Sequence, residues 1–205
     1  NYFGPTYRKD IRDWYSRVRQ AGYEQKVGSL EWGVGPSGKS ENNMSAYQCG
    51  MVLSEMFMQF MESGFHIACL YPGSFDAGMP RGLLDPETLE PLPSFYMFKL
   101  FKRALGNELV ESSCGRMDVP VVAVADKDGG KLWIYLLNKT GNKCSTMVDI
   151  ADKKIQSCTQ TSISPVDING NEVEKDKKTI SFSQRYAEVQ LPSFSLSRLT
   201  VELSP

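Results

Sequence analysis

The sequence predicts an α/β unit that is followed by an antiparallel β-sandwich. Up to about residue 108, stretches with helical spacing of apolar residues alternate with short apolar runs. Beyond that point only short β-rich runs follow, and turns rich in Gly, Asn and Asp separate them. With 205 residues, of which 41% are hydrophobic, the chain can bury a sizeable core. We therefore expect two domains, residues 1–108 and residues 109–205.

The α/β unit is predicted to begin with a helix between Pro5 and Gly22. Proline fits the first helical turn, where its missing N–H costs little, and glycine is common just past a helix end. Apolar side chains recur on one face of this helix, at Tyr7, Ile11, Trp14, Tyr15 and Val18. This spacing predicts a helix that packs through that face. A short strand, Val27 to Trp32, is expected next.

A second helix is predicted from about Met44 to Ser63. Apolar residues cover most of its circumference, which is typical of a helix buried on several sides. Four of them are methionines that we expect to fill the core: Met51, Met56, Met58 and Met61. The run "FHIACLYP" then predicts a strand covered on both faces, with His66 in a structural role. Ser94 to Leu105 is the third predicted helix, with Ser94 as its N-cap.

The second half of the chain contains runs such as "VPVVAVAD" and "KLWIYLLN". The turns at 126–130, 139–142 and 167–171 carry residues that tolerate positive φ. Regular short strands joined by such turns predict an antiparallel sandwich. Trp133 and Tyr135 alternate along one strand, so we expect them to pack in the core.

Charge and cysteine content argue against several classes of function. The chain has 23 basic and 24 acidic residues, so no basic field indicates nucleic acid or an anionic membrane. The basic run at Lys175, Lys177 and Lys178 is interpreted as a solvated hairpin tip. Apolar stretches fall short of the roughly 20 residues that a membrane span requires. Five scattered cysteines and one histidine lack the spacing of zinc ligands, and we predict no metal and no cofactor.

The segment Gly33 to Ser40 matches the phosphate-binding pattern G-x-x-x-x-G-K-[ST]. In a nucleotide loop the helix starts directly after the Lys-Ser pair, so that its amides face the phosphates. Here Glu41, Asn42 and Asn43 come before the apolar periodicity, which begins at Met44. A P-loop nucleotide-binding protein therefore stays a third hypothesis, and a flexible loop is the preferred interpretation.

Glu31 is a candidate catalytic residue because it stands at the end of the strand Val27 to Trp32. In a parallel barrel, chemistry collects at the carboxyl ends of the strands. A carboxylate held there can attack an anomeric carbon, while a protonated carboxyl on another strand assists the leaving group. The alternative is an ordinary surface acid at a strand end, and position alone favours that alternative.

Several phrases in order resemble the last quarter of a clan A glycoside hydrolase: "YEQKVGSLEWGV", a long helix, "GFHIACLYP" and "RGLLDPETLEPLPSFYMFKLF". "LWIYLLNKT" and "LPSFSLSRLTVEL" resemble the β-sandwich that follows the barrel in arabinofuranosidase-, xylosidase- and agarase-like members. The resemblance covers nearly the whole chain. It implies part of a (β/α)8 TIM barrel, about strands 6–8 and helices 6–8, in residues 1–108. It also implies a retaining, double-displacement enzyme that cleaves a poly- or oligosaccharide without a cofactor.

The resemblance also implies residue roles. Glu31 would be the nucleophile, and Tyr2, just after a presumed strand six, matches a tyrosine that often hydrogen-bonds it. Trp32 and Tyr71 would line the sugar subsite, although many members carry Trp where this chain has Tyr71. The acid/base Glu of the clan follows an Asn at the end of strand four, which lies outside this chain. We therefore expect an inactive C-terminal fragment whose partners are a carbohydrate and the remainder of the barrel or another copy.

A different class of function stays open at this point. The chain could be a non-catalytic carbohydrate-binding or interaction module in which the sandwich is the functional unit. Glycan binding that survives removal of residues 1–106 would favour that hypothesis.

Overall fold

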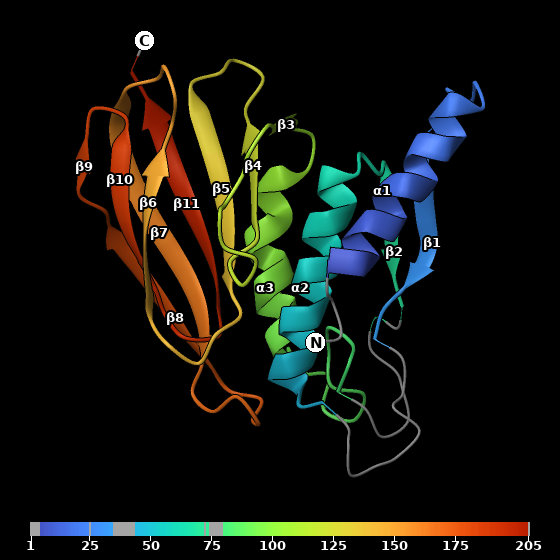
Figure 1. Ribbon diagram of the computed structural model, residues 1–205. Helices are drawn as coiled ribbons and strands as arrows, with labels where there is room; N and C mark the ends of the chain where they lie inside the picture. Colours follow the sequence, from blue (N-terminus) through green and yellow to red (C-terminus); the bar gives the residue numbers. More distant parts are fainter. Residues whose placement is uncertain (1–4, 25, 35–43, 72, 74–79, 205) are drawn as a thin grey trace.

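The computed structural model describes residues 5–24, 26–34, 44–71, 73 and 80–204. The described helices and strands form four layers (Figure 1). A three-stranded sheet faces a six-stranded sheet, two helices cover the other face of the six-stranded sheet, and a two-stranded sheet lies beyond those helices. No described helix is long and apolar enough to cross a membrane.

The helical part of the chain is built around a βαβ unit. Strands β1 and β2 run parallel, and helix α2 connects them. The bounds of the elements are α1 Pro5–Gln20, β1 Gly28–Trp32, α2 Ala46–Glu62, β2 Ile67–Leu70, α3 Pro93–Phe101 and the 3-10 turn η2 Lys102–Ala104. These elements follow the order that the sequence predicts.

Helix α2 starts at a capping box. The Ser45 hydroxyl accepts a hydrogen bond from the amide of Gln48, and the Gln48 side chain accepts one from the amide of Ser45. This cap fixes the start of the helix at Ala46, two residues after the predicted start at Met44. The helix ends before Gly64, whose φ of +75° is the left-handed conformation that glycine adopts at low cost.

Helix α1 is less buried than its amphipathic pattern predicts. Trp14 is 50% exposed, and Tyr15 is half-buried. Both rings contact Phe65, with centroid distances of 6.1 and 6.3 Å. At these two described positions the face of α1 is therefore only partly covered, and both rings meet the side chain that follows α2.

The predicted cap of α3 is wrong. Leu92 is the N-cap residue, and Pro93 occupies the first turn, where proline needs no hydrogen bond. The Ser94 hydroxyl instead donates to the carbonyl of Gly82 and ties the helix to the preceding loop. The helix ends in the turn η2, and Gly106 follows with a φ of +76°.

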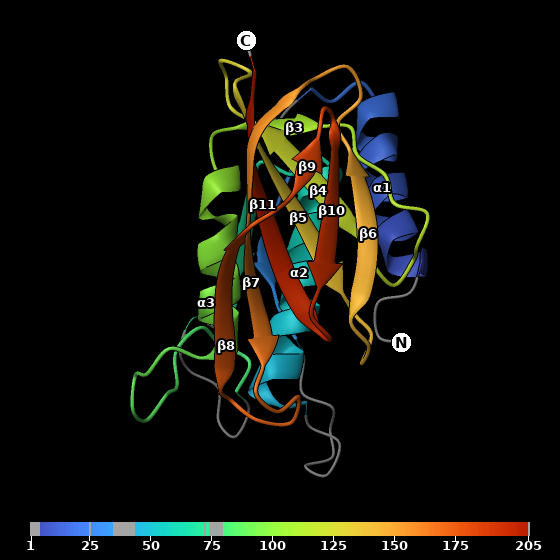
Figure 2. The ribbon, with the colours of Figure 1, turned by 90° about the vertical axis from the view of Figure 1, so that its left-hand side faces the viewer.

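The rest of the chain forms two antiparallel sheets, in agreement with the predicted antiparallel sandwich (Figure 2). The sheet orders are β3-β4-β5-β11-β7-β8 and β6-β10-β9. The strands are β3 Glu108–Val110, β4 Val121–Ala125, β5 Lys131–Asn138, β6 Cys144–Asp149, β7 Ile155–Pro165, β8 Val173–Thr179, β9 Phe182–Ser183, β10 Tyr186–Leu191 and β11 Ser195–Leu203.

The predicted hairpin tip at Lys175–Lys178 is wrong. These residues lie within β8, where Lys175 pairs with Ile163 and Lys177 pairs with Thr161 of β7. The turn before β8 contains Gly170, whose amide donates to Asp167. The five charged residues of β8, Glu174 to Lys178, are compatible with a strand because β8 is an edge strand of its sheet.

Three clusters of buried side chains separate the layers. The first lies between the two sheets of the sandwich and includes Leu199 and Val201. The second joins the six-stranded sheet to α2 and α3, and it contains Trp133 and Tyr135 as predicted. The third joins α2 to the two-stranded sheet and includes Trp32. The predicted core methionines Met51, Met56 and Met58 are buried, and Met61 is partly buried.

Polar contacts hold α2 on the sandwich. The buried Tyr47 hydroxyl lies 2.6 Å from the carbonyl of Phe194, to which it donates. Glu55 and Lys139 form an ion pair of 2.8 Å, and both side chains are mostly buried. The position of the βαβ unit relative to the sandwich is thus fixed by directional bonds as well as by apolar packing.

Candidate active site

Glu31 lies near the carboxyl end of β1 and points away from α2. Its neighbour Trp32 packs against α2, and successive side chains of a strand point to opposite faces. The Glu31 side chain is exposed. The main chain around it is held by Ser29, whose hydroxyl donates to the Glu31 carbonyl at 2.9 Å. The strand therefore offers the carboxylate on the side that the helices leave open.

A β-bulge occurs at the same place. The pairing of β1 with β2 shifts by one residue between Ser29 and Trp32. Two residues, Leu30 and Glu31, therefore stand opposite the single residue Cys69. Leu30 is 82% exposed, so both members of the bulge lie on the open side of the sheet. Bulges are over-represented next to active sites, where they re-aim side chains.

Tyr71 lies at the same end of the neighbouring strand. Its amide donates to the Trp32 carbonyl at 2.8 Å, and its side chain is 55% exposed. A Cβ at Gly33 would lie 2.1 Å from the carbonyl oxygen of Tyr71. Only glycine permits this close approach of the two strand ends. The first glycine of the phosphate-loop pattern therefore has a role in strand packing.

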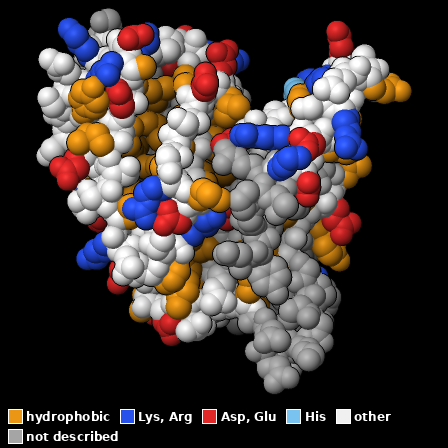
Figure 3. Space-filling model, viewed as in Figure 1, with side chains coloured by type: hydrophobic (Ala, Val, Ile, Leu, Met, Phe, Trp, Pro, Cys, Tyr) orange, Lys and Arg blue, Asp and Glu red, His pale blue; other side chains and the backbone are white. Residues whose placement is uncertain are grey.

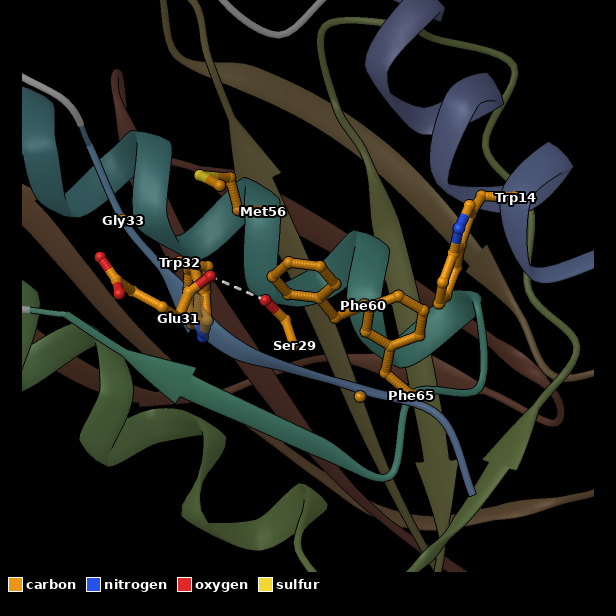
Figure 4. Close-up of a pocket in the computed structure, with 9 residues that line it drawn as sticks. Trp14, Ser29, Glu31, Trp32, Gly33, Met56, Phe60 and Phe65 are labelled. Atoms are coloured by element: carbon orange, nitrogen blue, oxygen red, sulfur yellow. Dashed lines mark hydrogen bonds between the residues drawn. The ribbon is translucent and has the colours of Figure 1, made fainter. Parts of the chain in front are cut away.

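A hollow of about 400 Å³ lies beside Glu31, between α1, β1 and α2 (Figure 4). Its lining includes Trp14, Ser29, Glu31, Met56, Phe60 and Phe65. In Figure 4 the Glu31 carboxylate points away from the rings of Phe60 and Phe65, so it borders the hollow without filling it. No residue of β2 contributes to the lining, so the hollow follows the other edge of β1. Among the described residues, no strand pairs with that edge.

Trp32 occupies the core, although the resemblance implies a place in the sugar subsite. It is 6% exposed. Phe57 stacks on it with a centroid distance of 6.2 Å, and Phe60 meets it edge-on at 5.1 Å. It anchors β1 on α2 through these rings, and it also borders the hollow beside Glu31.

Tyr2 and residues 35–40 of the phosphate-loop pattern lie outside the described residues. The helix that follows that pattern begins at Ala46, after the intervening residues Glu41 to Ser45. Its first amides are capped by Ser45. A nucleotide loop instead leaves these amides free for the phosphates.

Other reactive groups are poorly placed for catalysis. Within the described ranges, no cluster of three or more His, Cys, Asp or Glu side chains could hold a metal ion. Burial raises the pKa of the Cys49 and Cys158 thiols to about 11, so both remain weak nucleophiles at neutral pH. His66 is exposed at the start of β2.

Sequence reasoning missed two features of this site. Trp14 was assigned to a packing face, yet half of its surface is open and it lines the hollow. Gly28 also permits close contact of the strands, because a Cβ there would lie 2.5 Å from the carbonyl oxygen of Ile67. The two glycines that bracket "SLEW" are a signal in the sequence that could have indicated this tight pairing.

No family model and no curated protein matches the chain. Its fold does match solved structures of glycoside hydrolases. A GH30 endoxylanase from Clostridium papyrosolvens C71 matches 94% of this chain and 46% of its own, with a TM-score of 0.70 at 15% identity. A GH51 α-L-arabinofuranosidase from Thermotoga petrophila RKU-1 matches 96% of this chain and 47% of its own, with a TM-score of 0.69 at 16% identity.

A family 44 endoglucanase from Clostridium acetobutylium ATCC 824 matches 94% of this chain and 35% of its own, with a TM-score of 0.69 at 14% identity. The chain thus spans less than half the length of each of these three structures. At such low identity the likeness establishes a glycosidase-like fold over the length of this chain.

Proposed function

We propose that this chain is the C-terminal part of a retaining glycoside hydrolase. Residues 1–108 supply about strands 6–8 and helices 6–8 of a (β/α)8 barrel, and residues 109–205 supply the sandwich. The observation that carries the proposal is the exposed Glu31 at the carboxyl end of a parallel strand, opposite the helices and beside Tyr71. In a complete barrel that position faces the site where chemistry collects.

Glu31 acts as the nucleophile in this proposal. Its carboxylate attacks the anomeric carbon and displaces the leaving sugar oxygen, which a second carboxyl protonates. Water, deprotonated by that second group, then releases the sugar from Glu31 with retention of configuration. Retaining enzymes hold the two carboxyl groups about 5–5.5 Å apart. The second carboxyl comes from a strand outside this chain, so the chain alone is inactive.

The surfaces around Glu31 support an additional partner, the remainder of the barrel. Leu30 and Tyr71 are exposed on the open side of the two-stranded sheet, and Ile67 is 53% exposed there. Two-stranded sheets are marginal on their own. In the proposal the strand before α1 pairs with the edge of β1 along the hollow, and further strands cover Leu30 and Ile67. Tyr71 then contacts the sugar.

The first test compares the 205-residue chain with a longer polypeptide that contains the upstream sequence of its gene. Both are assayed on 4-nitrophenyl α-L-arabinofuranoside, 4-nitrophenyl β-D-xyloside and xylan. We expect activity in the longer polypeptide alone. Glu31→Gln should lower kcat on the order of a thousandfold or more, because it removes the nucleophile. Glu24→Gln, at an exposed position before β1, is the matched control.

Covalent labelling distinguishes a catalytic nucleophile from an acid that has only a structural role. A 2-deoxy-2-fluoro glycoside should label the longer polypeptide once, on the peptide that contains Glu31. Labelling of another carboxylate, or undiminished turnover by Glu31→Gln, would contradict the assignment.

The second candidate is a carbohydrate-binding module in which the sandwich, with its own core between two sheets, is the functional unit. Helices α2 and α3 cover the outer face of the six-stranded sheet, so the intact chain is the better test object than a truncated one. Binding of neutral xylan or arabinan by the intact chain, unchanged by Glu31→Gln, would support this function. Absence of ATP binding in calorimetry would remove the third candidate, the nucleotide protein.

A further inference from the structure

A second hollow lies between the C-terminal end of α3 and the six-stranded sheet. Its volume is about 410 Å³, which lies within the range of small-molecule sites. Five cationic side chains line it, and we call this surface the basic groove: Lys99, Lys102, Arg103, Lys175 and Arg198. No Asp or Glu contributes to its lining, and it shares no residue with the hollow beside Glu31.

These five cations are not neutralised within the part of the chain that the structure describes. None of them is in an ion pair with a described carboxylate. Elsewhere pairs are common, as between Lys131 and Glu202 at 3.1 Å. On the face in Figure 3, Lys and Arg side chains lie interspersed with Asp and Glu. The basic groove therefore concentrates positive charge in a protein whose net charge is −1.

Arg198 is held at the floor of the groove. One guanidinium nitrogen, Nη1, donates to the carbonyl of Leu100 at 3.2 Å, while Nε is buried and has no acceptor among the described residues. Burial is the main cause that lowers the pKa of Arg198; Tyr135 acts in the opposite direction, and the nearby charge of Arg103 adds to the lowering. Arg198 thus carries its charge in a partly buried position, where a bound anion would be favourable.

The side chain of Lys175 is also held in place by a contact within the protein. Its ammonium nitrogen lies 3.4 Å from the centroid of the Tyr96 ring, a cation–π contact across from β8 to α3. Thr161, on the strand between β8 and β11, adds a hydroxyl to the floor. A site with fixed cations, a hydroxyl and an aromatic wall suits an oxyanion carried on a ring-shaped molecule.

We propose that the basic groove binds the acidic groups of a glycan, namely the carboxylate of a uronic acid or a sulfate ester. Arginine presents paired donors that match the oxygens of either group. The choice of a glycan rests on the proposed function, since a glycosidase meets a polysaccharide as its substrate. Nucleic acid is the competing polyanion, and the test below includes it as an outcome.

The test measures binding to matched acidic and neutral polymers by affinity electrophoresis and calorimetry, with the intact chain carrying Glu31→Gln. Polygalacturonate is compared with its methyl ester, and a sulfated galactan with the desulfated polymer. We expect the acidic member of at least one pair to bind and its neutral partner to fail. The pair that responds identifies carboxylate or sulfate. Added sodium chloride should weaken the binding, because exposed charges are screened.

Two double variants locate the binding. Lys102→Ala/Arg103→Ala removes two exposed cations of the groove and should lower affinity about tenfold or more. Lys153→Ala/Lys154→Ala removes the same charge from exposed positions outside the groove and should leave affinity unchanged. Circular dichroism checks that both variants fold.

Several results would overturn the proposal: equal binding of acidic and neutral polymers, equal losses in the two double variants, or no binding at all. Equally tight binding of a DNA oligonucleotide would show an unselective polyanion site instead. The result of this binding test is independent of the hydrolytic proposal. Hydrolysis is tested through Glu31, whereas the binding assay uses a chain in which Glu31 is already replaced.

Discussion

The sandwich and the β1–β2 sheet bury their strands to very different degrees. In β11, Leu199 and Val201 pack toward the other sheet, while Leu196 packs toward the helices, and all three are fully buried. In the β1–β2 sheet only the face toward α2 is covered, and Leu30 on the other face is open to solvent. Both faces of the six-stranded sheet are covered, one by the three-stranded sheet and one by α2 and α3, whereas the β1–β2 sheet is covered on one face and leaves the other for further contacts.

The largest expected effect comes from the core of the sandwich. Leu199→Ala should lower the free energy of unfolding by about 2–5 kcal/mol, because a fully buried side chain leaves a cavity. Leu30→Ala should change it by less than about 0.5 kcal/mol, since that side chain is exposed. Urea denaturation followed by tryptophan fluorescence measures both. Similar losses of unfolding free energy in the two variants would contradict the difference in burial between the sandwich and the β1–β2 sheet.

The next effect is a local one within the β1–β2 sheet. Gly33→Ala should cost about 1–3 kcal/mol, because its Cβ would collide with the carbonyl oxygen of Tyr71. Amide hydrogen exchange should show faster exchange at Tyr71 while the amides of β11 stay protected. Gly115→Ala is the control, since nothing lies within 4 Å of a Cβ at that position. Uniform loss of protection in the whole molecule would mean that the two regions unfold as one.

A smaller effect is expected from the hydrogen bond that ties α2 to the sandwich. Tyr47→Phe removes the hydroxyl that contacts the carbonyls of Phe194 and Ile163 and should cost about 1–2 kcal/mol, because a part-buried and a buried acceptor lose this partner. The same change at the exposed Tyr23 should be neutral. Thermal unfolding monitored at two wavelengths would detect whether the helices now separate from the sandwich before it melts. An unchanged midpoint for Tyr47→Phe would rule out a role for this bond in stability.

The smallest expected effect is a pH dependence of the stability of the loop before α3. The amides of Thr88 and Glu87 donate to the Asp85 carboxylate at 2.8 and 3.0 Å, and these bonds lower the pKa of Asp85. A lowered pKa means that the stabilisation is complete above the unfolded value of about 3.9 and is lost as the pH falls through the folded value. The chemical shift of the Thr88 amide, followed by NMR as a function of pH, reports the protonation of Asp85. Asp85→Asn should abolish this dependence.

The periodic elements could be predicted because their signals are local. Helix α2 shows apolar residues around its circumference, and the strands of the sandwich alternate between turns with glycine. The errors arise where a tertiary contact, and not the local sequence, determines the structure. Ser94 bonds to Gly82 and does not cap its helix, and the lysines near residue 177 belong to a strand because β7 offers them backbone partners.

The candidate site was only partly predictable for the same reason. The sequence indicates that Glu31 ends a strand, but the bulge depends on the register with β2, which no local pattern encodes. The stacking of Trp32 on Phe57 depends on how α2 lies over the sheet. The basic groove joins residues as far apart in sequence as Lys99 and Arg198, so a near-neutral composition hides it.

The extra residue in β1 gives this strand more backbone than its partner at the position of the acid. Ser29 and Trp32 keep their partners in β2 whether one or two residues stand between them, so Leu30 is a spare position in the strand. Loss of its codon would restore plain alternation with Glu31 still on the outer side. Such a deletion would shorten the backbone that carries the acid, while Trp32 would keep its place against α2.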